Sequence, residues 1–456
     1  MGNVKYILLI RALGPTYGTY SLPYGIIAIA NYIHSHSEYR AIIVDRYKEF
    51  WRGINYITGI IKARDVRIVG ISAMSSQRDD AVYMARHIKN DIPGVKVILG
   101  GIHFTAMPED GLKHADAVVK GEGEKIFLSM TDAFFRNNAD IKGIYRGESL
   151  VDLDEAGYPT REVLKKVLIK SGRGFLLMSS RGCPYECKFC LSRAIRDARM
   201  RYHSIESMFD YVELLAADFR IRNIFFTDDI FILRKDRILK FYDEFNKRGL
   251  SRYNIEFACF THAGHGDMEV YSKLREIGFK SMAIGVEFGD DRILEINGKR
   301  QKTADVERTI RLITAAGIKL RCLFMIGGMG EDSSTIQKTI SLAERLRKEH
   351  RCLVSFSLAQ PLPGSEFFQE AEKYGRMIGK NCFQYSTRKI SFLPEGMSKQ
   401  ELMGLYLKAR LLDKKNIVRY FAESFHWHYF RRLFMDTVAG LYYKSAVAGR
   451  IEDSGR

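Results

Sequence analysis

The sequence of 456 residues lacks several features that define other classes of protein. No apolar run reaches the roughly 18 residues that a membrane-spanning helix needs, so we expect a soluble protein or at most a peripheral one. The amino terminus does not combine a basic start, an apolar stretch and a small-residue cleavage site, so no secretory leader is predicted. Seven cysteines are an odd number and few for this length, which argues against a disulfide framework and favours a reducing cytoplasm.

The charge is strongly positive but lacks any dense basic block. Lys and Arg total 71 against 54 Asp and Glu, which gives a net charge of +17. Such a balance attracts an anionic substrate, an anionic membrane surface or nucleic acid. The basic residues are spread along the whole chain without a recognised nucleic-acid motif, so solvated surface charge is the default and no nucleic-acid partner is expected. With 46% hydrophobic residues, a chain of this length predicts two or three folded domains.

Three of the cysteines are concentrated in one short run. The segment from Ser179 to Ser192 places Cys183, Cys187 and Cys190 in a C-x3-C-x2-C spacing. Cysteine thiolates are the usual ligands of iron-sulfur clusters, and a complete 4Fe–4S site takes four of them. A set of three therefore predicts a cluster in which one iron stays open to a small molecule.

Zinc is the less favoured alternative for this run. Zinc prefers four ligands, usually as two cysteine pairs or a mixture of Cys and His. No second pair lies near, because the other four cysteines are scattered singly: Cys259, Cys322, Cys352 and Cys382.

The first 140 residues alternate between short apolar runs and helix-length amphipathic stretches. Short β-branched runs are typical of buried parallel strands, and this alternation predicts a doubly wound α/β domain. The predicted strands are Lys5–Ile10, Arg40–Val44, Val66–Ile71, Val95–Leu99 and Ala117–Val119. The predicted helices are Tyr24–Ser35, Ile54–Ala63, Asp80–Asn90 and His103–His114.

Small and polar residues follow these strands, at the edge where ligands bind in such folds. Each loop alone is ordinary turn chemistry. The loops are Leu22–Gly25, Ser72–Gln77 (which includes Ser75), Gly100–Phe104 (Gly100, Gly101 and His103) and Gly121–Glu124 (Gly121 and Glu122).

Residues 141–170 are predicted to be a linker, because glycines and a proline interrupt the pattern. The alternation then resumes with longer units over residues 171–370. Six strands separated by helix-length segments predict a partial (β/α)6 barrel with its site at the carboxyl ends of the strands. The strands are Phe175–Ser179, Asn223–Thr227, Ile255–Phe260, Ser281–Val286, Lys319–Met325 and Leu353–Ala359.

The cysteine run, with Phe189 before the third cysteine and Arg-Gly before the first, resembles the cluster loop of radical S-adenosylmethionine (SAM) enzymes. The resemblance implies a 4Fe–4S cluster whose open iron binds SAM. It also implies that the later strand ends contact SAM, through Asp228, Glu287, Gly327, Gly328 and Glu331. For Asp228 a helix cap is an equally weighted alternative, and the turn Pro361–Ser365 is as well explained by closure of the barrel. Met329-Gly330-Glu331 replaces the family's Pro-Gly-Glu, a mild departure.

The amino-terminal loops, taken as a set, resemble the cobalamin-binding domain of cobalamin-dependent radical SAM proteins. The resemblance implies that cobalamin lies against Ser72, Ser75, Gly100, Gly101, His103, Gly121 and Glu122. Many cobalamin domains carry Asp-x-His-x-x-Gly after the second strand, but this chain has Asp45–Phe50 without a histidine there. No lower axial imidazole is expected, and we interpret His103 as a loop residue near the corrin or its nucleotide tail; a structural role at a helix start is the alternative.

Residues 371–456 are predicted to form a mainly helical segment that caps the barrel. The stretch Tyr420–Phe434 mixes aromatic and basic residues. A core-packing face is the favoured interpretation. An interfacial helix on a membrane, with an apolar or lipid-like substrate, is the alternative.

The resemblance implies a cytoplasmic C-methyltransferase that acts on an unactivated carbon of a small-molecule substrate and needs an external one-electron donor. One alternative is a cobalamin-binding cyclase or rearrangement enzyme without methyl transfer. Another is a non-catalytic sensor that binds corrinoid or cluster, against which the strand-end motifs count. No catalytic acid or base and no specific substrate are identifiable from the sequence, because the cofactors carry the difficult chemistry.

Overall fold

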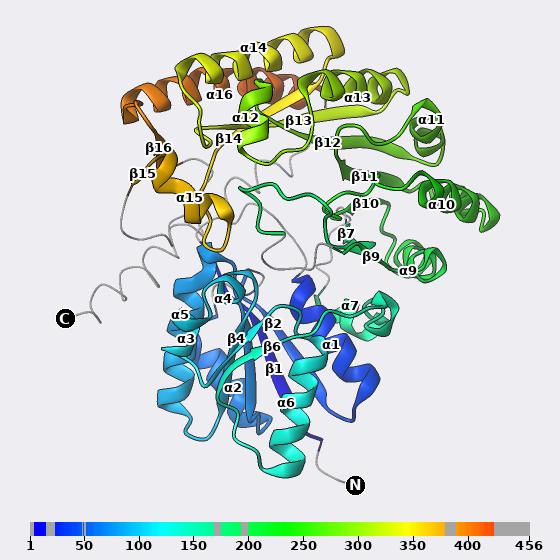
Figure 1. Cartoon of the computed structure of the whole chain (residues 1–456). Coiled ribbons are helices and arrows are strands. Elements are labelled where there is room, and N and C mark those ends of the chain that lie inside the picture. Colours follow the sequence, from blue (N-terminus) through cyan, green and yellow to red (C-terminus); the bar gives the residue numbers. More distant parts are fainter. Residues whose placement is uncertain are drawn as a thin grey trace. The chain divides into compact units, whose positions relative to one another are not determined.

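The structure is a computed structural model that describes residues 4–14, 23–47, 49, 52–167, 175–192, 199–378 and 389–423, with the backbone alone for 166–167 and 413–423. The chain divides near residue 170 into two compact units, each described below by itself (Figure 1).

The amino-terminal unit is built on a six-stranded parallel sheet in the order β2-β1-β3-β4-β5-β6. The doubly wound prediction is confirmed, and the five predicted strands are present with shifts of one or two residues at their ends. The strands are β1 (Tyr6–Arg11), β2 (Arg40–Asp45), β3 (Ile68–Ser72), β4 (Lys96–Gly100), β5 (Ala117–Lys120) and β6 (Gly143–Arg146).

Helices cover both faces of this sheet because successive strand residues point to opposite sides. In β1, Leu8 and Ile10 join a core with α2 (Ile54–Ala63) and α3 (Arg78–Asp91). Its neighbours Ile7 and Leu9 join a second core with the other pair of helices. That pair is α1 (Tyr24–His36) and α6 (Glu124–Asn137).

Two predictions for this unit are wrong. The expected helix His103–His114 is broken into α4 (Ile102–Ala106) and α5 (Pro108–Leu112), because proline favours the first turn of a new helix and restricts the residue before it. Part of the expected linker 141–170 instead belongs to the sheet, where β6 pairs with β5. The sequence did not predict β6, because the side chains of this strand are at least partly exposed and form no apolar run. The same range also holds η2 (Leu153–Glu155) and α7 (Arg161–Val167).

The carboxyl-terminal unit is an open, six-stranded parallel sheet whose strands follow the chain in order. The predicted partial barrel is confirmed. Its strands are β7 (Phe175–Leu177), β10 (Asn223–Phe226), β11 (Glu256–Thr261), β12 (Phe279–Glu287), β13 (Lys319–Ile326) and β14 (Leu353–Leu358).

Helices connect these strands along the outer side of the sheet (Figure 1). They are α9 (Ile205–Asp218), α10 (Lys235–Lys247), α11 (Met268–Glu276), α12 (Asp291–Ile296), α13 (Thr303–Ala315) and α14 (Ser333–His350), with η3 (Leu250–Tyr253) after α10. After β7, the two-residue strands β8 (Ser180–Arg181) and β9 (Arg201–Tyr202) pair antiparallel.

The segment after β14 is mainly helical, as predicted, but it also contains a short ribbon. Strands β15 (Gly375–Met377) and β16 (Phe392–Pro394) pair antiparallel between α15 (Glu366–Tyr374) and α16 (Lys399–Glu423). Helix α16 packs against β14 and α14. Most of the aromatic-basic stretch lies outside the described residues. Within the described part of the chain, no helix is both long and apolar enough to cross a membrane.

Candidate active site

The three cysteines lie on a loop of residues 182–192, here called the cysteine loop, which follows β7 and β8. Cys183, Cys187 and Cys190 are free, partly exposed thiols. Burial is the main reason that the pKa of Cys187 is raised to about 11, and the charges of the other two thiols add to it. The thiols are therefore electrostatic neighbours at the carboxyl end of the first barrel strand, where the sequence places them.

The chemistry of the three thiols fits a 4Fe–4S cluster, whose usual ligands are cysteine thiolates. Among the described residues, no group of three or more His, Cys, Asp or Glu is close enough to hold a single metal ion. Zinc needs all its ligands around one point. In a cubane cluster each cysteine binds its own iron, so three cysteines would leave the fourth iron without a protein ligand.

Backbone hydrogen bonds hold the cysteine loop from two other segments. The Lys188 N–H donates to the carbonyl of Asn297 at 3.0 Å, and the Phe367 N–H donates to the carbonyl of Lys188 at 2.8 Å. The Lys188 ammonium pairs with Glu366 at 3.2 Å and Glu370 at 2.9 Å. The loop thus has a fixed shape that α15 and the segment after α12 determine.

Of the two aspartates after β10, Asp228 is buried against Ser179 and Ser180. It is 1% exposed and accepts hydrogen bonds from the Ser179 N–H at 3.1 Å, the Ser179 hydroxyl at 2.9 Å and the Ser180 hydroxyl. It caps no described helix, because α10 begins only at Lys235. Its oxygens tie β10 to the chain just before the cysteines, and its contact with SAM stays a prediction. Its neighbour Asp229 is partly exposed and acts electrostatically on Cys183.

Glu287 ends β12 in a left-handed conformation, with φ of 66°. A non-glycine residue there is strained, and such strain is concentrated at functional sites. Its carboxylate lies 3.5 Å from the ammonium of Lys299. Burial raises the pKa of Glu287, and Lys299 opposes that rise.

Lys299 is a site residue that the sequence did not reveal. It is 8% exposed, and its charge also acts on Cys183, Cys187 and His262. A buried cation is costly unless negative charge surrounds it. Lys299 thus offsets the charge of the cysteine loop, but it lies in a turn whose pattern does not mark it.

The glycine run after β13 does not offer its backbone to a ligand as predicted. The Gly327 and Gly328 N–H groups donate to one carboxylate oxygen of Glu331, at 2.7 and 2.9 Å. A side chain at Gly328 would place its Cβ 2.5 Å from the ring of Phe288, so the glycine admits that ring. Burial raises the pKa of Glu331 to about 8.

The sequence also did not predict a cluster of three rings beside the cysteine loop, formed by Tyr185, His262 and His265. Tyr185, between the first two cysteines, stacks on His262 with centroids 4.0 Å apart and planes at 8°. The Tyr185 hydroxyl lies 2.6 Å from Nε2 of His265. These histidines follow β11, and only the tertiary fold brings them to the cysteines.

In the amino-terminal unit, the loops after β3 and β4 touch. Gly101 has φ of 88°, and a Cβ there would lie 2.6 Å from the Ser72 hydroxyl. His103 is fully buried, with Nδ1 3.2 Å from the Ser75 hydroxyl and Nε2 3.3 Å from Asp110. These contacts support the structural alternative, and a contact of His103 with the corrin or its tail stays a prediction.

The loop after β5 is held in a similar way. The Gly121 N–H donates to the Thr105 hydroxyl at 3.1 Å, and the Glu122 carboxylate accepts the Leu150 N–H at 3.2 Å. Gly100, by contrast, has room for a side chain, since a Cβ would meet its nearest atom at 3.5 Å. The predicted cobalamin residues thus come together at one edge of the sheet, and their contact with cobalamin stays a prediction.

Salt bridges occupy the place after β2 where many cobalamin domains carry a histidine. Asp45 pairs with Arg11 through two contacts of 2.8 and 2.7 Å. Arg46 pairs with the buried Asp80 at 2.7 Å. The loops at this edge depend on glycines, and no imidazole follows β2. This arrangement fits a corrin that receives no axial ligand from the loop after β2.

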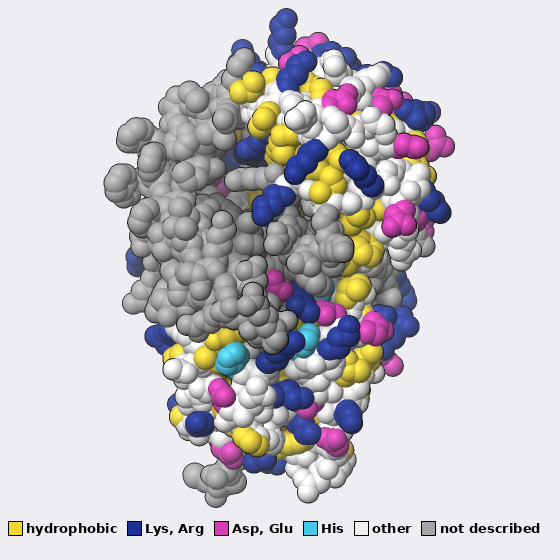
Figure 2. All heavy atoms as spheres, turned by 90° about the vertical axis from the view of Figure 1, so that its left-hand side faces the viewer, with side chains coloured by type: hydrophobic (Ala, Val, Ile, Leu, Met, Phe, Trp, Pro, Cys, Tyr) yellow, Lys and Arg dark blue, Asp and Glu magenta, His cyan; other side chains and the backbone are white. Residues whose placement is uncertain are grey.

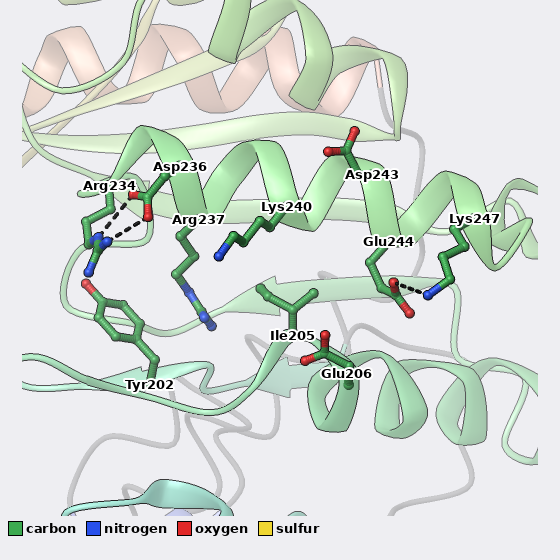
Figure 3. A pocket seen from close by; sticks show the side chains of 10 residues that line it. All are labelled: Tyr202, Ile205, Glu206, Arg234, Asp236, Arg237, Lys240, Asp243, Glu244 and Lys247. Carbon is green, nitrogen blue, oxygen red and sulfur yellow. Dashed lines mark hydrogen bonds and ion pairs between the residues drawn. The ribbon is translucent and has the colours of Figure 1, made fainter.

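A groove of about 600 Å³ opens between α9 and α10 (Figure 3). Its charged side chains partly pair with one another, as in Arg234–Asp236 at 2.6 Å and Lys247–Glu244 at 3.2 Å. It lies between helices of the outer layer, so we do not assign it to the active site. On the face in Figure 2, basic and acidic side chains are interspersed, as expected for solvated surface charge.

Two family models match the chain. The B12 binding domain matches residues 10–130, and the radical SAM superfamily matches residues 177–343. The two domains imply a 4Fe–4S cluster, SAM and cobalamin as cofactors.

Among curated relatives, a protein of Pyrococcus horikoshii named an uncharacterized methyltransferase is 29% identical over 90% of this chain and 95% of its own length. The anaerobic magnesium-protoporphyrin IX monomethyl ester cyclase of Rubrivivax gelatinosus is 24% identical over 74% of this chain and 63% of its own.

Solved structures show the same fold. The cobalamin-dependent SAM radical enzyme OxsB, with aqua-cobalamin and SAM bound, aligns with a TM-score of 0.73 and 16% identity over 96% of this chain and 72% of its own. The radical SAM methyltransferase TsrM of Kitasatospora setae aligns with a TM-score of 0.66 and 17% identity over 81% and 76%. With both domains matched in this order, the chain belongs to the cobalamin-dependent radical SAM enzymes.

Proposed function

We propose that this protein is a methyltransferase that uses cobalamin and radical SAM chemistry to methylate an unactivated carbon of a small molecule. The observation that carries the proposal is the combination in one chain of a cobalamin domain and a three-cysteine loop with an open iron position. The alignment of nearly the whole chain with a relative named a methyltransferase supports it.

The residues at the barrel edge have distinct roles in this proposal. Cys183, Cys187 and Cys190 hold the cluster, and Asp229 takes the SAM ammonium group in place of the predicted Asp228. Lys299 and Glu287 orient SAM by their opposite charges, 3.5 Å apart. When bound, the cofactors supply the electron that cleaves SAM and the methyl group that is transferred.

The test uses anaerobically reconstituted protein with cobalamin, SAM and a one-electron reductant. We expect 5′-deoxyadenosine and S-adenosylhomocysteine, with a methylated product once the substrate is present. A protein with a complete cluster and bound corrinoid that does not cleave SAM would contradict the proposal and favour a sensor.

A cyclase or rearrangement enzyme is the second candidate, favoured by the similarity to the Rubrivivax cyclase. Such an enzyme forms 5′-deoxyadenosine without S-adenosylhomocysteine. The ratio of the two products in a reaction with substrate therefore separates the candidates.

An apolar or lipid-like substrate with peripheral membrane contact remains a prediction based on the stretch Tyr420–Phe434, as does location in the cytoplasm. Sedimentation with anionic phospholipid vesicles tests the contact. Absence of binding contradicts the contact, and binding that survives replacement of Trp427 and Phe430 by alanine contradicts the role of this stretch.

A further inference from the structure

His262 lies where a ligand of the barrel would be. It directly follows β11, a central strand that pairs with β10 and with β12. The cysteine loop and Glu287 follow other strands of the same parallel sheet, so all three lie at its carboxyl edge. His262 is only 4% exposed.

One hydrogen bond determines the tautomer of His262. Its Nδ1 lies 2.8 Å from the carbonyl oxygen of Ala263. A carbonyl oxygen can only accept, so Nδ1 carries the proton. Burial lowers the pKa of His262 to about 3, with the charge of Lys299 acting in the same direction, so the ring is neutral at physiological pH. A neutral imidazole has one N–H, and Nε2 is therefore a bare acceptor.

That acceptor is buried and has no hydrogen-bond partner among the described residues. The nearby Tyr185 hydroxyl is already engaged with His265, which leaves its ring to stack on His262. A second tyrosine, Tyr271, donates its hydroxyl to the carbonyl of His265 and so holds that neighbour in place. Stacking on Tyr185 fixes one face of the imidazole, and the hydrogen bond of Nδ1 fixes one edge. Nε2 has no hydrogen-bond partner among the described residues.

A buried acceptor without a donor costs about 1–3 kcal/mol, which favours a ligand that supplies the donor. The stacked Tyr185 belongs to the cysteine loop itself, so a molecule bound at the open iron of a cluster on that loop would lie beside this ring. SAM carries suitable O–H and N–H donors in its ribose, adenine and amino groups.

We propose that Nε2 of His262 accepts a hydrogen bond from SAM and positions it on the cysteine loop. This inference rests on the proposed function only for SAM as the ligand, not for methyl transfer. His262 is a binding and positioning residue here, with no role as an acid or base.

The experiment measures SAM binding to anaerobic, cluster-loaded full-length protein by equilibrium dialysis. His262→Phe keeps a ring for Tyr185 but removes the acceptor, and we expect the Kd for SAM to rise about tenfold or more. His262→Gln restores an acceptor, and its Kd should stay within about threefold of the original. Iron content and the electron paramagnetic resonance spectrum of the reduced cluster show whether each variant is loaded.

His350→Gln is the matched control, because it makes the same change in a histidine at the end of α14, outside the site, and it should leave the Kd unchanged. An unchanged Kd in a loaded His262→Phe protein overturns the inference. An equal loss of SAM affinity in His262→Gln overturns it as well. If Phe prevents cluster loading, the comparison of His262→Leu with His262→Gln decides in the same way. These outcomes are independent of whether methyl transfer occurs, since none requires a substrate.

Discussion

The two units present the same kind of edge, the carboxyl ends of a parallel sheet, but differ in how their polar groups are satisfied. At this edge of the amino-terminal unit, several described polar side chains have partners within the chain. Both ring nitrogens of His103 lie near polar oxygens, Asp45 is paired with Arg11, and Glu122 accepts a backbone N–H. These described side chains are therefore satisfied before any ligand binds.

The corresponding edge of the carboxyl-terminal unit, the barrel edge, has buried polar atoms without a hydrogen-bond partner among the described residues. These atoms are Nε2 of His262, Oε1 of Gln301, Oδ1 of Asn297 and Oε1 of Glu331. Buried polar groups normally have partners, so their concentration here is a sign of polar recognition. The barrel edge thus has unpaired buried polar atoms of the kind that a small polar ligand would satisfy, whereas the named side chains at the other edge are paired within the chain.

The largest expected effect is loss of the cluster at the barrel edge, with corrinoid binding by the amino-terminal unit unchanged. Cys187→Ala removes one of three cluster ligands, so we expect loss of the cluster and of SAM cleavage by more than about a hundredfold. Iron analysis and 5′-deoxyadenosine formation measure this. Corrinoid binding by the amino-terminal unit should persist, and Cys352→Ala, at a cysteine outside the cysteine loop, should retain the cluster. A fully loaded Cys187→Ala protein would refute the cluster assignment.

The next effect separates the two aspartates of the barrel edge. Asp228→Ala leaves three buried donors of Ser179 and Ser180 without an acceptor, so we expect about 2–4 kcal/mol lower stability. Anaerobic urea denaturation measures it. Asp229→Asn should change stability by less than about 0.5 kcal/mol but weaken SAM binding about tenfold. The reverse pattern would return the SAM contact to Asp228.

A pH effect is expected at Glu331. Its pKa is raised to about 8 by burial, so folding favours the protonated acid. The stability from this group is present in full below its unfolded pKa of about 4.3 and is lost as pH rises through about 8. Urea midpoints should fall over this window, and Glu331→Gln, which stays neutral, should flatten the fall. An equally steep fall in the variant contradicts the assignment.

The smallest effect tests the shape of the amino-terminal edge. Gly101→Ala combines a φ of 88° with a Cβ 2.6 Å from Ser72, so we expect about 1–3 kcal/mol lower stability and weaker corrinoid binding. Gly100→Ala is the control, with space for the methyl group and an expected cost under about 1 kcal/mol. Thermal unfolding and corrinoid titration measure both, and equal effects of the two changes would contradict the role of the close approach.

Much of the fold was predictable because its signals are local. Buried strands such as β1 and β3 are short β-branched runs, and the periodicity of α2 predicted its bounds exactly as Ile54–Ala63. The exposed edge strand β6 and the break before Pro108 were missed, since one lacks an apolar run and the other depends on a single residue. The cysteine loop was predictable because its three ligands lie within one turn-rich segment.

By itself, the sequence determined the order of the two α/β units and the loop that carries the cysteines, because spacing along the chain encodes both. Only the tertiary structure decided which side chains face that loop. Adjacent residues such as Asp228 and Asp229 have different surroundings, one buried against serines and the other partly exposed. Tyr185 and His262 belong to distant segments that meet only when parallel strands align their carboxyl ends. Local spacing cannot specify such contacts, which is why the barrel's polar edge emerged only from the fold.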